Sequence, residues 1–274
     1  MKKLFLAAAF LGAMGFADDG NLPPLKPAIQ AKYDDYVRAA EARIQDEVKT
    51  PTYLWSQGSP ARWQRIRGGQ VVAEPSGKTG DLDIGSAIIH DWTGAVFIPG
   101  VTLSQVVSFL QDYPNHKNYY GPEVSDTRLL SHEGNDWRIH FRLYEIKVVT
   151  VVLDVDQTVT YHPVSATRLY TSAAATSISE ENTKRGHDRG YMWRLNTYWR
   201  LEERDGGVCV ESRSISLSRT PPFGLGWLFN PIISSLPGGS LSRLLIATRK
   251  AVLSRQHAGH LRFHILQPQP SPPA

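Results

Sequence analysis

The sequence has 274 residues, of which 41% are hydrophobic and 20% are charged, as is typical of one globular domain with or without an appendage. The formal net charge is only +4 at pH 7, and no long basic run or repeated aromatic and basic pattern occurs, so nucleic acid is excluded as the expected partner. The single cysteine, Cys209, excludes an intramolecular disulfide and a zinc site built from several cysteines.

The first 17 residues have the pattern of a secretory signal peptide. Two lysines precede an apolar run from Leu4 to Phe16, and the small residues Gly15 and Ala17 suit cleavage after Ala17. The run is shorter than the roughly 20 apolar residues that a membrane-spanning helix needs. Cleavage would remove Lys2 and Lys3 and lower the formal charge from +4 to +2. We therefore expect an exported protein, either periplasmic or secreted.

Residues 18–83 are predicted to form an N-terminal extension of a helix and loops. From Ala28 to Val48, apolar residues recur at helical spacing, which predicts an amphipathic helix packed on the main domain. Residues 49–84 are rich in glycine, proline and serine, and this composition predicts loops or a short hairpin.

From Ile84 onward the pattern becomes that of strands. The first strand is interrupted by Gly94 and ends at Pro99, and a short helix follows as far as Pro114. Further strands are predicted at residues 123–130, 136–145, 147–154, 157–162, 166–180, 190–204 and 207–218. Because the connectors between them are short, neighbouring strands should pair antiparallel.

The last predicted element is a long helix over residues 238–256. Its apolar stripe contains Leu241, Leu244, Leu245, Thr248 and Val252. One face of the sheet needs a cover, and this helix is the obvious one. The Pro-rich residues 257–274 are predicted to be a disordered tail.

Three stretches, together with this order of elements, carry a resemblance to a known superfamily. They are FIPGVTLSQVVSFLQDYPNHKNYYGPEV, YMWRLNTYWRLEERDGGVCVESRSISLSR and SLPGGSLSRLLIATRKAVL. Over residues 84–255 the sequence resembles the START and polyketide cyclase-like (SRPBCC, helix-grip) superfamily, in particular its exported bacterial members. The resemblance implies an α+β helix-grip fold over residues 84–256, with a curved antiparallel sheet of about seven strands wrapped around the C-terminal helix. It also implies a hydrophobic cavity between sheet and helix, and it carries no universal catalytic signature.

The strand over residues 190–204 has two unlike faces. Alternation places Trp193 and Trp199 on one face and Arg194 and Arg200 on the other. We expect the tryptophan face to look toward the C-terminal helix and the arginines to look outward. The tryptophans are then either ordinary core or the wall of a ligand cavity.

The turn at Asp205-Gly206 fixes how this strand pairs with the next one. A two-residue type I′ turn places Arg200 opposite Glu211, so that opposite charges share a face, whereas a three-residue turn shifts the pairing by one. We prefer the two-residue turn. It sets a row of small hydroxyls on the tryptophan face: Ser212, Ser214, Ser216 and Ser218.

A mixed wall of aromatic rings and a few hydroxyls is typical of a small-molecule site. The predicted cavity lining consists of Trp193, Leu195, Trp199, Ser212, Ser214, Leu241, Leu244, Leu245 and Thr248. The preferred hypothesis is therefore an exported protein that binds a lipid or another hydrophobic small molecule.

The connector over residues 220–238 is unusually apolar for a loop. Its aromatic residues Phe223, Trp227 and Phe229 predict a lid at the cavity entrance, a transient contact with a membrane surface, or a segment of the core. A protein-interaction domain without a ligand is the further alternative, and it predicts an exposed Trp227 and no sizeable cavity.

A cyclase-like or hydrolase-like enzyme is the alternative from a different class, with His90 or Glu211 as a cavity acid or base. His90 and Asp91 are adjacent on a strand and point to opposite faces, so the two cannot act together. The histidines at positions 257, 260 and 264 have helical spacing, but no carboxylate ligand accompanies them. No catalytic residue, metal or cofactor is predicted.

Overall fold

A computed structural model describes residues 24–146, 150–180, 190–220 and 226–265. The described strands form one antiparallel sheet in the order β1-β3-β9-β8-β7-β6-β5-β4, and β2 also pairs with β3. Their bounds are β1 (Val72–Pro75), β2 (Asp81–Asp83), β3 (Ala87–Pro99), β4 (Val124–Glu133), β5 (Asp136–Ile146), β6 (Thr150–Ser165), β7 (Arg168–Glu180), β8 (Met192–Arg204) and β9 (Gly207–Arg219).

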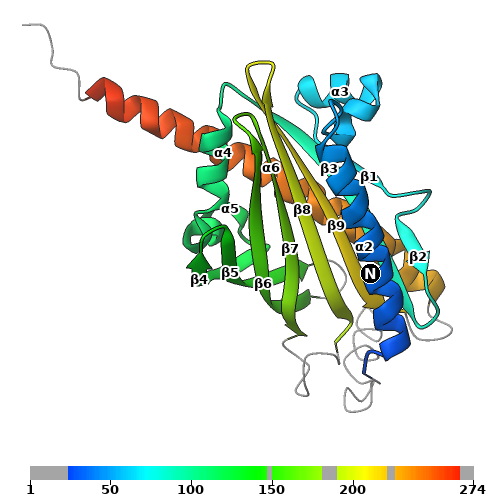
Figure 1. The fold of residues 1–274 in the computed structure, drawn as a ribbon. Helices are drawn as coiled ribbons and strands as arrows, with labels where there is room; N and C mark the ends of the chain where they lie inside the picture. Colours follow the sequence, from blue (N-terminus) through cyan, green and yellow to red (C-terminus); the bar gives the residue numbers. More distant parts are fainter. Residues whose placement is uncertain (1–23, 147–149, 181–189, 221–225, 266–274) are drawn as a thin grey trace, which may run out of the picture.

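Helices lie on both faces of this sheet (Figure 1). Their bounds are α2 (Pro27–Val48), α3 (Pro60–Arg67), α4 (Leu103–Leu110), α5 (His116–Tyr120) and α6 (Gly226–Ile265), with short 3-10 turns η2 (Trp55–Gly58) and η3 (Tyr113–Asn115). The long helix α6 crosses one face diagonally, and α4 and α5 join β3 to β4. A curved, unclosed antiparallel sheet with a C-terminal helix across it is the predicted α+β helix-grip fold.

The strand count exceeds the predicted seven because the N-terminal extension contributes to the sheet. β1 and β2 both pair with β3, at the edge of the sheet, and they do so from residues that were predicted to be loops or a short hairpin. The two strands predicted at residues 147–154 and 157–162 are one strand, β6, with a bulge between Asp156 and Gln157. A bulge interrupts the alternation of side chains without ending the strand.

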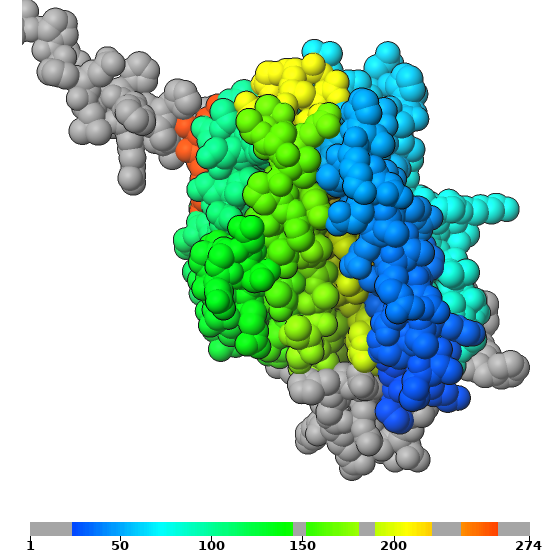
Figure 2. All heavy atoms as spheres, in the orientation of Figure 1, coloured from blue at the N-terminus to red at the C-terminus, as the bar shows by residue number. Residues whose placement is uncertain are grey.

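Helix α2, predicted from its spacing, covers the face of the sheet opposite α6. Its buried residues are Ile29, Tyr33, Val37, Ala40 and Ile44, which pack on the outward side chains of β3, β8 and β9. The Tyr33 hydroxyl lies 2.9 Å from the Ile215 carbonyl oxygen and 2.9 Å from Asn196 Oδ1. Figure 2 shows α2 as a ridge beside the uncovered front of β6 and β7. The domain therefore has two cores, one on each face of the sheet.

Helix α6 is longer than predicted at both ends. It begins at Gly226, so most of the predicted connector is helical, and it ends at Ile265 rather than near residue 256. Phe223 lies outside the described residues, as do the side chains of Trp227 and Phe229, the predicted signal peptide and the last nine residues. Among the described residues, no helix combines the length and the apolar character needed to cross a membrane.

Candidate functional site

Two glycines seat α6 on β3. A Cβ atom added to Gly94 would lie 2.8 Å from Leu245 Cδ1 and 3.2 Å from the Leu241 side chain. A Cβ atom added to Gly238 of the helix would lie 2.4 Å from the ring of Trp92. Each glycine thus accommodates a large side chain of the opposite element. As a result α6 packs mainly on β3 and less on the middle of the sheet.

The α6 face of β8 is incompletely covered. β8 is an interior strand between β7 and β9, yet Leu195, Thr197 and Trp199 on this face are only partly buried. Ser214 on β9, opposite Thr197, is also partly exposed. Residues of an interior strand that face a close-packed core are normally buried, so α6 covers this part of β8 and β9 incompletely.

An aromatic cluster forms the end of the site near α4 and α5. Its members are Phe109, Tyr113, His116, Tyr119, Tyr120, Trp137, Phe141 and Tyr161. The hydroxyls of Tyr113 and Tyr161 lie 2.6 Å apart. Burial lowers the pKa of His116 to about 4 and raises the pKa of Tyr161 to about 12. His116 and Tyr161 are therefore uncharged at neutral pH, whereas the Arg255 guanidinium lies over the rings of Phe109 and Tyr119.

The predicted stripe of α6 faces the sheet. Leu241, Leu245 and Thr248 are buried, and Leu244 packs partly buried against the same core. Thr248 Oγ1 donates to the Leu244 carbonyl at 2.8 Å and lies 2.9 Å from the Tyr120 hydroxyl. This orientation agrees with the sequence analysis, whereas contact of these residues with a ligand stays a prediction.

The predicted register of the β8–β9 hairpin is confirmed. Arg204 pairs with Gly207, and Asp205 and Gly206 both have positive φ, at 53° and 77°. Arg200 therefore lies opposite Glu211, with Nη2 and Oε2 3.3 Å apart. The same register places Trp199 opposite Ser212, and Ser212 is buried.

Trp193 does not share a face with Trp199, and that expectation is wrong. A bulge between Met192 and Arg194 adds one residue to β8, and this shifts the alternation of its side chains. Trp193 is buried in the core beneath α2, where the Arg219 guanidinium lies 4.4 Å from its ring centroid. Trp193 is thus removed from the candidate cavity lining.

Glu211 also faces α2 rather than α6, so it is not a cavity acid or base. Its carboxylate accepts backbone hydrogen bonds from Trp55 at 2.9 Å and from Ser56 at 2.7 Å, beside Arg200. Burial raises the pKa of Glu211, and Arg200 opposes that effect. Arg200 lies on the face predicted for it, but α2 covers that face and Arg200 is only 8% exposed.

His90 lies on the α6 face and has two partners that the sequence analysis did not identify. Its Nδ1 lies 2.7 Å from Asp81 Oδ1 and its Nε2 lies 2.8 Å from Ser218 Oγ. Asp91, on the opposite face as expected, pairs instead with Arg213 at 2.6 Å. An alternating strand pattern around Asp81 could have predicted its pairing with His90, but β2 has only three residues and gives too short a pattern.

Comparisons with known proteins give a likeness of fold. No family model matches the chain, and no curated protein matches it. Many solved structures match the chain. One is the protein TTHA0849 from Thermus thermophilus, with 15% identity, a TM-score of 0.46, and coverage of 60% of this chain and 97% of that chain.

Two further structures belong to the groups named in the resemblance. A STAR-related lipid transfer protein from Xanthomonas axonopodis has 17% identity and a TM-score of 0.44, covering 63% of this chain and 98% of that chain. The Zhui aromatase/cyclase from a Streptomyces species has 8% identity and a TM-score of 0.47, covering 61% and 95% respectively. The identity is below 25% and the TM-score is below 0.5 in each of these three cases, so the helix-grip fold of this chain rests on its own strand order and C-terminal helix.

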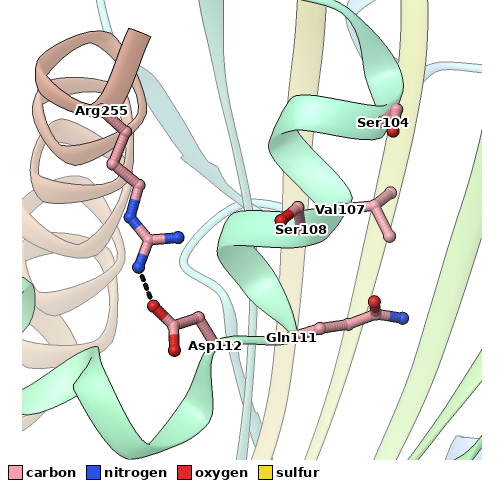
Figure 3. Close-up of a pocket in the computed structure, with 6 residues that line it drawn as sticks. All are labelled: Ser104, Val107, Ser108, Gln111, Asp112 and Arg255. Atoms are coloured by element: carbon pink, nitrogen blue, oxygen red, sulfur yellow. Dashed lines mark ion pairs between the residues drawn. The ribbon is translucent and has the colours of Figure 1, made fainter. Parts of the chain in front are cut away.

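Two open hollows lie on the surface of this helix-grip domain, away from the predicted cavity residues. Figure 3 shows the first, of about 490 Å³, between α4 and α6, where Arg255 forms an ion pair with Asp112. Its lining consists of Ser104, Val107, Ser108, Gln111, Asp112 and Arg255. The second, also about 490 Å³, lies between α5, β4 and β5 and includes Lys117 and Tyr144. None of the predicted cavity residues lines either hollow.

Proposed function

We propose that the protein binds a hydrophobic small molecule or lipid between α6 and the sheet. The observation that carries this proposal is the partial exposure of Leu195, Thr197 and Trp199 on an interior strand that faces the helix. In a closed core these side chains would be buried. Their partial exposure supports a space that a ligand can fill.

The chemistry of this wall suits a ligand with an apolar body and few polar groups. Over residues 194–201 of β8 and 208–218 of β9, the charged side chains Arg194, Arg200, Glu211 and Arg213 lie on the α2 face. The α6 face of the same segments carries aliphatic residues, Trp199 and serine hydroxyls. Ligand sites of this kind bind through apolar contact and a small number of oriented hydrogen bonds.

We also propose that the protein is exported before it binds its ligand. The proposal rests on residues 1–17, which combine two lysines, an apolar run and a small-residue cleavage site. The ligand is then one met in the periplasm or outside the cell.

A titration with a fluorescent fatty-acid analogue tests the binding function. Thr197→Arg places a charged side chain in the proposed space and should weaken binding at least about tenfold, since a charge in an apolar site is costly. Ala174→Arg is the matched control, because Ala174 pairs with Asn196 on the neighbouring strand and is exposed on the opposite face. Equal affinities for the two variants would contradict the proposal.

A further inference from the structure

Three side chains from three adjacent strands form a continuous hydrogen-bonded chain on the α6 face. Asp81 lies on β2, His90 on β3 and Ser218 on β9. The distances are 2.7 Å from Asp81 Oδ1 to His90 Nδ1 and 2.8 Å from His90 Nε2 to Ser218 Oγ. The arrangement thus places a carboxylate, an imidazole and a hydroxyl in sequence.

The pairing of the strands explains why these residues meet. Asp81 is directly opposite His90 in the β2–β3 ladder. Ser216 is opposite His90 in the β3–β9 ladder, so the imidazole reaches diagonally to Ser218, two residues farther along the same face of β9. Strand pairing on both sides fixes the backbone of β3 at this position, and the His90 side chain is only 4% exposed.

The hydrogen bonds select the histidine tautomer that a general base requires. An ionised carboxylate only accepts hydrogen bonds, so Asp81 accepts from Nδ1–H of His90. Nε2 is then the basic nitrogen, and it faces the Ser218 hydroxyl. The other acceptor near Ser218 Oγ is the Arg219 carbonyl, at the longer distance of 3.4 Å.

Partly exposed residues border Ser218. Met192 pairs with Ser218 across the β8–β9 ladder and is partly exposed, and Leu195 and Ser214 farther along the same face are also partly exposed. Partly exposed residues of β8 therefore run from Trp199 to Met192, which is opposite Ser218, and Ser218 itself is 8% exposed. A ligand held there can present a polar end to this hydroxyl.

We propose that Ser218 is the nucleophile of an ester-hydrolysing site, with His90 as its base and Asp81 as the residue that orients His90. The substrate class is a carboxylic ester with a hydrophobic acyl or alcohol group. This substrate class rests on the proposed binding function. The chain of hydrogen bonds is an independent observation.

The reaction balances without a further reactant except water. Ser218 Oγ bonds to the acyl carbon while its proton passes to His90 Nε2, and collapse of the tetrahedral intermediate breaks the bond to the alcohol, which takes that proton. A water molecule then gives a proton to Nε2 and its hydroxide to the acyl carbon. The bond to Ser218 breaks, the proton returns to Oγ, and the free acid leaves.

A fluorophosphonate probe tests the nucleophile directly, because Ser218 Oγ would displace fluoride and retain the phosphonyl group. Mass spectrometry of peptides from the full chain should find the group on Ser218. Ser218→Ala should abolish labelling, and His90→Gln should slow labelling and the hydrolysis of a p-nitrophenyl fatty-acid ester by about 10³-fold. Asp81→Asn should lower the rate without changing the labelled residue.

Ser172→Ala is the matched control, since it removes a serine hydroxyl that lies 2.9 Å from the Nε2 of another histidine, His162, on the α2 face of the sheet. It should label at the wild-type rate, and melting temperatures show whether each variant is folded. Absence of labelling in the folded wild type, or labelling that survives Ser218→Ala, would overturn the proposal. If the wild-type protein binds the fatty-acid analogue but is not labelled by the probe, the proposed hydrolysis is refuted and the proposed binding function stands. If Ser218 is labelled but the analogue does not bind, the proposed binding function is refuted and the nucleophile stands.

Discussion

At the scale of single residues, His116 gives the molecule a pH-dependent stability. Burial between the rings of Phe109 and Phe141 lowers its pKa to about 4, from an ordinary value of 6.5. The unfolded chain therefore binds the proton more readily between these values. The stabilisation is fully present above pH 6.5 and is lost as the pH falls toward 4, by about 3 kcal/mol in total.

Urea unfolding at pH 7 and pH 4.5 measures this contribution. The loss of unfolding free energy between the two values should be about 2 kcal/mol smaller in His116→Phe than in the wild type, because phenylalanine cannot bind a proton. His132→Gln, at an exposed position, should keep the wild-type dependence. An unchanged pH dependence in His116→Phe would contradict the assignment.

Arg200 is expected to stabilise the fold through the buried carboxylate of Glu211. Arg200→Met leaves that carboxylate without its cationic partner in a site that is only 1% exposed, which should cost about 3 kcal/mol of unfolding free energy. Adding Glu211→Gln should recover part of the loss. The control Arg38→Met, which breaks an exposed ion pair with Asp35, should cost less than about 1 kcal/mol. Equal costs for the two single variants would refute the prediction.

At the scale of elements, the contact between α6 and β3 depends on close approach at glycine. Gly94→Val would direct a branched side chain into Leu245 and Leu241, so chemical denaturation should show a loss of about 2 kcal/mol. Gly58→Ala is the control, because nothing lies within 4 Å of the added methyl group. A tolerated valine at position 94 would mean that α6 is not seated closely on β3.

The same elements show what the sequence could predict. The Asp205-Gly206 turn and the pairing of Arg200 with Glu211 followed from turn chemistry and charge, both of which are local. The start of α6 could not be predicted from local chemistry, because the prolines and glycines before residue 240 ordinarily break a helix. Trp193 was assigned to the wrong face because alternation alone does not reveal a bulge.

At the scale of the whole molecule, the helix-grip order of elements was predictable, whereas the chain of Asp81, His90 and Ser218 was not. The predicted helix, meander and terminal helix follow from periodicity, which depends on neighbouring residues. The three side chains lie far apart in the sequence and meet only through the pairing of β2, β3 and β9. The pairing of strands that are far apart in the chain is harder to predict from a single sequence than the position of each strand.

The signal-like start of the chain predicts a shorter mature protein. If residues 1–17 are cleaved, N-terminal sequencing of the protein recovered from the periplasm or medium should begin at Asp18. Recovery of the intact chain from the cytoplasm alone would contradict the proposal of export.

The central claim is that an apolar molecule occupies the space between α6 and the sheet. The most direct measurement is organic extraction of the protein purified without detergent, followed by mass spectrometry, with Thr197→Arg purified in parallel. We expect a lipid or another hydrophobic compound in near-stoichiometric amount from the wild type, and at least about tenfold less from the variant. An extract without such a compound, from wild-type protein that also fails to bind the fatty-acid analogue, would contradict the account.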